Sequence, residues 1–220
     1  PTADPFVQLA VRHSVPEWLA RRWISRWGLE RAERALAWSQ SHPDYWLRIP
    51  PGGDPPAGAR AGWIPGTARL GASGIRPLRH LLDEGRFAAQ DGSAILVGLL
   101  APEVRGRVLD LCAAPGTKTV HLAERAVEGT TIVALDRNLR RLAPLRNRLN
   151  RDGGARSGGP GTSARVFVVA ADSANLPLRG LFDGILLDAP CSNLGVLRRR
   201  VDLRHRVREE EIARLAGVQS

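Results

Sequence analysis

The sequence predicts an α/β fold with a parallel sheet, preceded by a smaller lobe of helices and strands. From residue 107 onward, short continuous apolar runs alternate with helical segments, which is typical of parallel strands joined by crossover helices. All six tryptophans fall within the first 63 residues, so the start of the chain is compositionally distinct. A length of 220 residues suffices for one α/β domain and a small lobe. We therefore predict a lobe over residues 1–84 and an α/β core over residues 85–220.

The lobe is expected to begin with two helices and a strand. Ser14-Val-Pro-Glu17 has the pattern of a capping box with proline in the first turn, and Gly28 is a plausible stop. Apolar residues recur between them at helical spacing, at positions 19, 23, 24 and 27. A second helix is predicted over 29–38, a strand over 45–49 and a Gly- and Pro-rich loop over 50–62. Tryptophans at helical spacing are expected to pack in the core, with stacking on RNA bases as the alternative.

The remaining elements follow from apolar runs and their punctuation. Short helices are predicted over 75–84 and 94–100. The expected strands are 107–112, 131–135, 165–169 and 184–188, and the expected crossover helices are 117–127 and 138–150. Continuous apolar strands predict a sheet buried on both faces. Residues 151–164, rich in Gly and Ser, are expected to form a disordered insert.

Charge and cysteine content bound the partners. The formal charge of +10 favours a polyanion such as RNA, and a high-GC genome would explain the Arg:Lys ratio but not the excess of basic residues. Two isolated cysteines predict neither a disulfide framework nor a zinc site, so we expect no metal and a reducing cytoplasm. No apolar run is long enough to span a membrane, and we expect a monomer. Methionine is absent even at position 1, which predicts a fragment of a longer product.

Lys118 is the only lysine among 32 basic residues. It lies in Asp110-Leu-Cys-Ala-Ala-Pro-Gly-Thr-Lys-Thr119, where a predicted strand turns into a helix. In open α/β sheets, ligands bind at such turns, and a compact ammonium is not interchangeable with a planar guanidinium. Lys118 is therefore a candidate active-site residue, and a chance survivor of codon bias is the alternative.

Four carboxylates follow or end the predicted strands: Asp110, Asp136, Asp172 and Asp188. Asp136 stands where a carboxylate can accept both hydroxyls of a ribose, and Asp172 could accept an amino group of adenine. Gly116 lets the loop backbone approach a ligand closely. Because no G-x-G-x-x-G motif is present to bind a pyrophosphate, the pattern favours an adenosine without one, as in S-adenosyl-L-methionine (SAM).

Cys191 follows Asp188 in Asp188-Ala-Pro-Cys191. Cytosine C5 becomes nucleophilic when a thiolate adds to C6, and an acid near N3 assists that addition. Asp188 is the candidate acid, and a small buried hydrophobe is the alternative for Cys191. Cys112 lies inside the predicted strand, where we expect a core residue next to the ligand loop.

These residues resemble the Sun-type RNA cytosine-5 methyltransferases. The matching segments are 14–19, 45–49, 85–91, 110–119, 134–138 and 185–199. The resemblance implies a Rossmann-like class I SAM-dependent methyltransferase domain, incomplete here, with an N-terminal RNA-binding lobe. It also implies active-site roles for Lys118, Asp188 and Cys191 in methylation of small-subunit ribosomal RNA. The expected SAM contacts are Cys112, Ala113, Ala114, Pro115, Gly116, Thr117, Lys118, Asp136, Arg137, Asp172 and Asp188.

Three departures from the family pattern stand out. The family carries its attacking thiol in a later Thr-Cys-Ser segment and uses the Pro-Cys cysteine for product release, but this chain has no third cysteine. We therefore expect SAM binding with little or no turnover. The family's small-subunit enzyme usually has a further N-terminal helical domain, which we expect these 220 residues to lack. Arg199-Arg-Val-Asp202 also replaces the usual Arg-Arg-His-Pro-Asp.

The stretch 198–208 holds six arginines directly after the candidate active-site loop. Arg198, Arg199 and Arg200 are candidate RNA contacts through phosphates, and a solvated helix face with self-paired charges is the alternative. The other functions considered are an RNA-binding scaffold with a vestigial SAM pocket, a methyltransferase acting on an exocyclic amine, and a nicotinamide dehydrogenase. Pro190-Cys191 argues against the amine, and the missing glycine fingerprint argues against the dehydrogenase.

Overall fold

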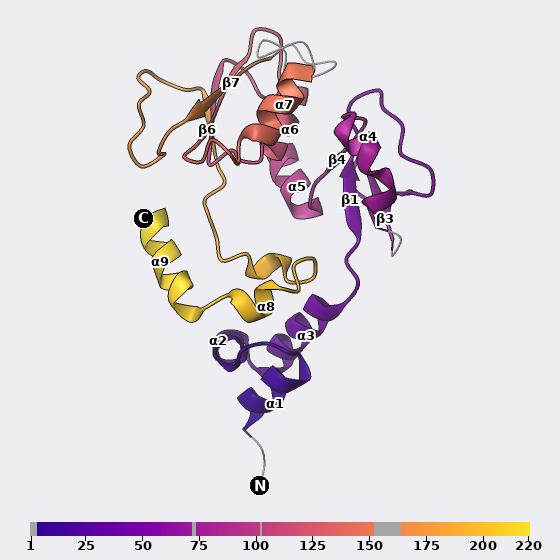
Figure 1. The fold of residues 1–220 in the computed structure, drawn as a ribbon, viewed down its shortest axis with the longest axis vertical. Helices are drawn as coiled ribbons and strands as arrows, with labels where there is room; N and C mark the ends of the chain where they lie inside the picture. Colours follow the sequence, from indigo (N-terminus) through magenta and orange to yellow (C-terminus); the bar gives the residue numbers. More distant parts are fainter. Residues whose placement is uncertain (1–3, 72–73, 102, 152–163) are drawn as a thin grey trace. The chain divides into compact units, whose positions relative to one another are not determined.

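The computed structural model describes residues 4–71, 74–101, 103–151 and 164–220, which form two compact units (Figure 1). Unit 1 combines residues 1–43 with 190–220, and unit 2 comprises residues 44–189. The boundary between an RNA-binding lobe and a methyltransferase core, which we predict after residue 84, stays a prediction. The insert predicted over 151–164 lies almost wholly outside the described residues.

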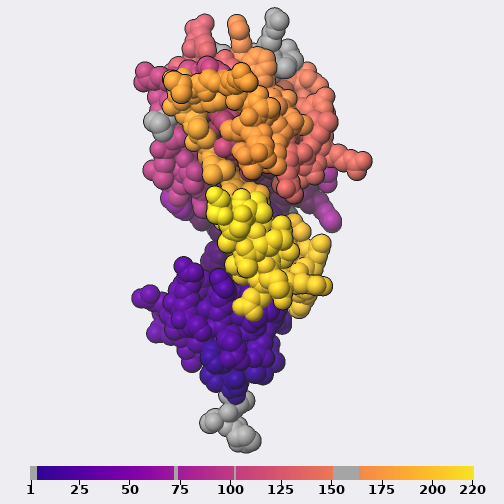
Figure 2. All heavy atoms as spheres, turned by 90° about the vertical axis from the view of Figure 1, so that its left-hand side faces the viewer, coloured from indigo at the N-terminus to yellow at the C-terminus, as the bar shows by residue number. Residues whose placement is uncertain are grey.

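Unit 1 joins the two ends of the chain in one core. The N-terminal helices are α1 (Pro5–Arg12), α2 (Glu17–Trp27) and α3 (Leu29–Gln40), and the C-terminal ones are α8 (Leu203–Arg206) and α9 (Glu209–Gln219). Leu197 is buried among Leu19, Leu36 and other residues of the first three helices. Figure 2 shows the yellow C-terminal segment directly against the indigo N-terminal one. The C-terminal residues thus complete a core that three short helices would leave half open.

The capping box predicted at Ser14 is wrong. The sequence reasoning missed α1, which Asp4 caps by accepting the amide of Phe6 at 2.8 Å. Because α1 extends to Arg12, Ser14 lies in the turn between two helices with φ of +49°. Its side chain makes no cap, and α2 begins after Pro16 instead.

The prediction that the tryptophans pack in the core is borne out only in part, since Trp18 and Trp23 are half-buried against the core of unit 1. None of the six is fully buried, and Trp27, Trp38 and Trp63 are exposed. The buried helix positions are occupied by smaller residues such as Leu19 and Ala32. Helical spacing therefore identified the helices correctly, but it did not distinguish the buried face from the bulky aromatic positions beside it.

Unit 2 begins with a small antiparallel sheet in the order β2-β3-β1-β4. Its strands are β2 (Arg60–Ala61), β3 (Thr67–Leu70), β1 (Tyr45–Arg48) and β4 (Ala88–Ala89). Only β1 was predicted, since the others are too short or too polar to give a pattern. The short helix α4 (Arg79–Asp83) packs beside this sheet, and Leu47 and Phe87 are buried in its core. The pairing of β1 with β4 leads the chain into α5 (Gly92–Leu100).

The predicted parallel sheet is confirmed, with strand order β7-β6-β5-β8. The strands are β5 (Arg107–Leu111), β6 (Thr131–Asp136), β7 (Arg165–Ala170) and β8 (Gly184–Leu187), and the crossover helices are α6 (Thr117–Glu124) and α7 (Ala143–Arg151). Helix α7 begins later than predicted, because the Asn138 side chain caps a turn by accepting the amides of Arg140 and Arg141. The central strands β5 and β6 start the two connections that meet at the candidate site.

The apolar strands predicted a sheet buried on both faces, but side chains of its two outer strands are exposed. Ile185 and Leu187 in β8 are 63% and 60% exposed, and Phe167 in β7 is also exposed. In the central strands β5 and β6, by contrast, Leu109, Ile132 and Leu135 are almost fully buried. Within the described ranges, no helix is both long enough and apolar enough to cross a membrane.

Candidate functional site

The loop between β5 and α6 is fixed by its own backbone and by Asp136. Gly116 has φ of +103°, and a Cβ there would lie 2.6 Å from Leu145 Cβ, so only glycine fits. The peptide bond between Ala114 and Pro115 is cis. Asp136 at the end of β6 accepts the amide of Ala114 at 3.2 Å through Oδ2. The end of β6 therefore holds in place the loop that follows β5.

Asp110 lies within β5 rather than at its end, and its side chain is fully buried. Thr119 of α6 donates a hydrogen bond to Asp110 Oδ2 at 2.6 Å. Burial raises the pKa of Asp110 to about 6, although the Thr119 bond opposes this. The other carboxylate oxygen, Oδ1, is buried without a hydrogen-bond partner among the described residues.

Lys118 and Asp188 pair at the carboxyl end of the neighbouring strands β5 and β8. Lys118 Nζ in α6 donates to Asp188 Oδ2, which directly follows β8. The aspartate is exposed, so water screens this ion pair and its contribution to stability is small. The position of this ion pair at a pocket therefore indicates a role in function more than a role in stability.

A pocket of about 190 Å³ opens between the loop, β5 and the start of α5. Its lining includes most of the predicted cofactor residues, namely Cys112, Ala113, Ala114, Pro115, Thr117, Lys118 and Asp188. Gly116 is buried within the loop, and Asp136 supports the loop by accepting the amide of Ala114; neither lines the pocket. Arg137 and Asp172 are exposed beyond β6 and β7, and Asp172 Oδ1 accepts the amide of Ala174 at 3.0 Å. Neither of those two residues lines the pocket.

Four residues that line this pocket were not predicted as site residues: Ala89, Gln90, Asp91 and Ala94. Asp110, one of the four carboxylates singled out in the sequence, also lines it. Asp91 caps α5 by accepting the amide of Ser93 at 3.0 Å. The signal available in the sequence was the polar pair Gln90-Asp91 directly before an apolar helix. Among the described side chains, no group of three or more His, Cys, Asp and Glu residues could hold a metal ion.

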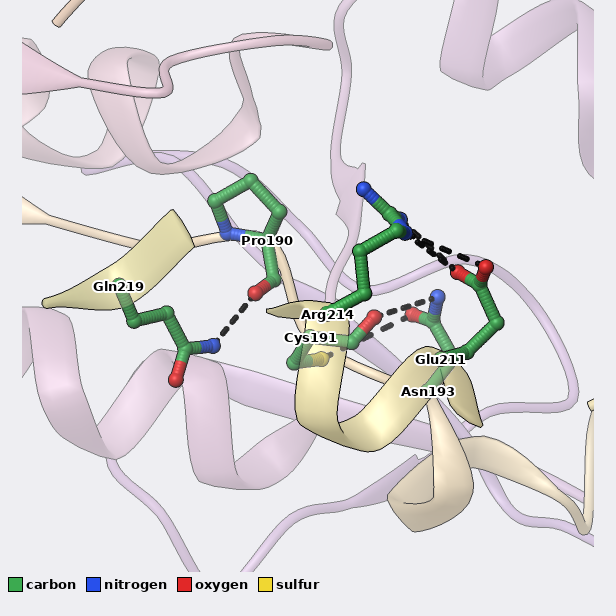
Figure 3. Close-up of polar contacts among 6 residues, drawn as sticks. All are labelled: Pro190, Cys191, Asn193, Glu211, Arg214 and Gln219. Carbon is green, nitrogen blue, oxygen red and sulfur yellow. Dashed lines mark hydrogen bonds and ion pairs between the residues drawn. The ribbon is translucent and has the colours of Figure 1, made fainter. Parts of the chain in front are cut away.

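The two cysteines differ in their surroundings. Cys112 is not the core residue of a strand that we expected, because β5 ends at Leu111. It is half-buried with φ of +61°, and its Sγ lies 3.8 Å from Ser173 Oγ. Cys191 is exposed in unit 1, in a loop that Asn193 and Gln219 brace (Figure 3).

Two side chains hold that loop by donating hydrogen bonds to its backbone carbonyl groups. Asn193 Nδ2 donates to Cys191 O at 3.2 Å, and Gln219 Nε2 at the end of α9 donates to Pro190 O at 2.6 Å (Figure 3). Glu211 and Arg214 pair on α9 in the same view. Although Cys191 is three residues from Asp188 in sequence, the two side chains belong to different units.

The Arg-rich stretch is partly structural. Arg198 donates to the carbonyls of Ser41 and His42, and the buried Arg204 donates to Ser39 O at 2.6 Å, so both satisfy carbonyls at the C-terminal end of α3. Arg198 also lies over the ring of Trp38, 4.6 Å from its centroid. Arg199 and Arg200 are exposed, and Arg200 binds Asp202 through two contacts of 3.1 Å.

Comparison with known proteins gives the family. Residues 97–220 match the model of the 16S rRNA methyltransferase RsmB/F family. The chain belongs to the RsmB/F family. It is 30% identical over 238 residues to the probable ribosomal RNA small subunit methyltransferase B of Bacillus subtilis, covering 98% of this chain and 50% of that protein. The chain thus spans about half the length of the curated relatives it matches.

Two solved structures extend the likeness to the fold. A methyltransferase homolog protein from Pyrococcus horikoshii is 25% identical, with a TM-score of 0.67 over 91% of this chain and 67% of that chain. NSun6 from Pyrococcus horikoshii with SFG is 17% identical, with a TM-score of 0.68 over 93% of this chain and 77% of that chain. The Rossmann-like methyltransferase fold predicted from the sequence is therefore confirmed.

Proposed function

We propose that this RsmB/F-family chain binds SAM and belongs to an enzyme that methylates C5 of a cytosine in small-subunit ribosomal RNA. The Lys118–Asp188 pair at the pocket beside the glycine loop carries this proposal. The residues present fit the cofactor, because the pocket contains a buried carboxylate oxygen of Asp110 without a partner and Asp136 stands at the adjoining strand end. SAM would supply an electrophilic methyl group there.

The base chemistry defines what the neighbouring side chains must do. Cytosine C5 attacks a methyl group only after a thiolate has added to C6, and an acid at N3 assists that addition. We assign the position beside N3 to Asp188, which Lys118 orients by donating to its Oδ2. In this assignment Cys191 serves product release, and the attacking thiol is the family's Thr-Cys-Ser cysteine.

RNA binding is proposed for unit 1 and the exposed arginines. The chain carries a formal charge of +10, and Arg199 and Arg200 present guanidinium groups at the surface. Phosphate contacts from such side chains would position the RNA without reading its sequence. Two of these guanidinium groups already have partners, since Arg198 binds the end of α3 and Arg200 binds Asp202, so a phosphate would compete with those contacts.

The test is methyl transfer from labelled SAM to unmethylated small-subunit rRNA, followed by mass spectrometry of the nucleosides, with calorimetry of SAM binding in parallel. We expect SAM binding that Lys118→Met and Asp188→Asn perturb, with little or no turnover by these 220 residues. If 5-methylcytidine appears and Cys191→Ser abolishes it, the base assignment stands and Cys191 is the nucleophile. A methylated adenosine or guanosine would refute the cytosine assignment.

A second function is favoured by one observation, since the basic unit 1 carries exposed tryptophans suited to stacking on bases. In that case the chain is an RNA-binding scaffold with a vestigial SAM pocket. Absence of heat on SAM titration, with RNA affinity intact, would select the scaffold over the enzyme.

A further inference from the structure

One face of the small antiparallel sheet in unit 2 carries a row of aligned side chains. Trp46 of β1 is opposite Arg69 of β3, and Arg69 is opposite Arg60 of β2. Because residues opposite each other in neighbouring strands project to the same face, these three side chains form a row across the sheet. Leu47 and Leu70, the next residues along β1 and β3, belong to the core that α4 covers. The row therefore lies on the face opposite α4.

A tryptophan from the loop between β2 and β3 extends this row. Trp63 packs against Trp46 with the ring centroids 5.5 Å apart and an interplanar angle of 84°. The guanidinium of Arg69 lies over the Trp46 ring, 5.5 Å from its centroid. Trp46 is half-buried, whereas Trp63 is 67% exposed. Trp63 is therefore the ring that offers its surface to a ligand.

The loop that carries Trp63 is held in place by its neighbours. Ile64, the next residue, is buried, and the amide of Gly62 donates to Thr67 O at 2.9 Å. A Cβ at Gly62 would lie 2.1 Å from Thr67 Oγ1 and 3.0 Å from Trp46 Cζ3, so this turn packs closely on the sheet. A ring that is already held at the surface loses little conformational entropy when it binds.

The two arginines of the row place positive charge beside the exposed ring. Arg60 is exposed and has no ion-pair partner within the part of the chain that the structure describes. Arg69 is 32% exposed, and Asp44 Oδ2 lies 3.8 Å from its Nη1, too far for a hydrogen bond. Aromatic rings on which bases stack, combined with cations that bind the backbone, are typical of sites for single-stranded nucleic acid. A protein partner would instead favour apolar neighbours around the ring.

This row adjoins the candidate site. Trp46 packs on the first residue of α5, where a Cβ at Gly92 would lie 3.2 Å from Trp46 Cε2. The amide of Gln90 donates to Trp46 O at 3.2 Å. Gln90 and Asp91 both line the pocket that contains the Lys118–Asp188 pair. An RNA strand that enters this pocket thus passes close to the row.

We infer that Trp63, Arg60 and Arg69 form a binding site for an unpaired RNA nucleotide near the target cytosine. The base stacks on Trp63, and the two arginines bind its phosphate. A base inside a duplex is stacked on both sides, so this site selects single-stranded RNA. The inference rests on the proposed function for its RNA substrate. It adds a site to the arginines proposed above in unit 1, because these three residues belong to unit 2.

The test measures binding of the 220-residue chain to a short unstructured RNA and to a duplex of the same length by fluorescence anisotropy. Trp63→Leu keeps an apolar side chain but removes the ring, and we expect it to weaken single-strand binding by about 5- to 150-fold. Trp63→Phe retains a π-face and should restore most of that loss. Arg60→Gln should lower the slope of log affinity against log salt by about 0.7, since one phosphate contact is lost.

Two variants serve as matched controls. Arg79→Gln removes an exposed arginine of α4, on the other face of the sheet, and should leave the affinity within about twofold. Trp38→Leu removes an exposed tryptophan of unit 1 that also lies beside an arginine. Circular dichroism and calorimetry of SAM binding show whether each variant keeps its fold and its pocket.

RNA affinity that Trp63→Leu leaves unchanged, or that falls only with Trp38→Leu, overturns this site and leaves the proposed function standing. Duplex bound as tightly as the single strand also overturns it. Unchanged RNA affinity with self-association lost in Trp63→Leu, measured by analytical ultracentrifugation, would reassign the face to a protein contact. A wild-type chain that binds neither RNA nor SAM overturns the proposed function as well.

Discussion

Gly116→Ala tests whether the loop beside the candidate site is fixed by close packing. The added methyl would lie 2.6 Å from Leu145 Cβ, closer than real Cβ contacts allow, and φ at this residue is +103°. A left-handed backbone costs a non-glycine residue about 1–2 kcal/mol, and overpacking a well-filled core costs about 1–3 kcal/mol. We therefore expect the free energy of unfolding to fall by about 2–5 kcal/mol.

Gly129→Ala is the control for backbone strain alone. Gly129 has φ of +82°, but a Cβ there would meet nothing within 4 Å. We expect a loss of about 1–2 kcal/mol, and the difference between the two variants isolates the collision with Leu145. Urea unfolding followed by circular dichroism gives both values, and amide hydrogen exchange of β5 and β6 assigns the loss to unit 2. Equal losses in the two variants would refute the packing argument.

Three further predictions concern the helices and pH. Gly98→Ala should destabilise by about 1–3 kcal/mol, because its Cβ would lie 2.2 Å from His121 Nδ1, whereas Gly217→Ala in α9, with open space, should stabilise by up to about 1 kcal/mol in thermal unfolding. Burial lowers the pKa of His121 to about 4, so stability is fully present above the unfolded pKa near 6.5 and is lost as pH falls toward 4. His121→Gln should therefore reduce the pH dependence of the free energy of unfolding between pH 6.5 and 4 by up to about 3 kcal/mol. Urea unfolding of both proteins across this range measures it, and an equal pH dependence in the two would contradict the prediction. Arg204→Met should cost about 1–3 kcal/mol by leaving the end of α3 unsatisfied, while the exposed Arg206→Met should cost less than about 0.5 kcal/mol by the same assay.

The sequence by itself determined the features that depend on neighbouring residues. Apolar runs placed the four parallel strands, because a strand buried between its neighbours must be apolar along its length. Gly116 was expected to let the loop approach a ligand closely, but in the structure its φ of +103° and the neighbouring Leu145 side chain are what require glycine. The order of strand, loop and helix then placed Lys118 and Asp188 at one sheet edge, where they pair.

Only the tertiary structure decided the features that join residues far apart in the chain. Gln90 acquires its orientation from Arg48, 42 residues earlier, and Arg204 caps a helix that ended 164 residues before it. The sequence gives no periodic signal for such pairs, because each partner satisfies a hydrogen bond rather than a repeating face. Burial followed the same rule, since Leu36 faces a core completed by Leu197 from the other end of the chain, while Trp38 on the same helix stays exposed. Local spacing sets where helices and strands form, and the long-range packing of those elements decides which of their polar and aromatic side chains reach a pocket or the solvent.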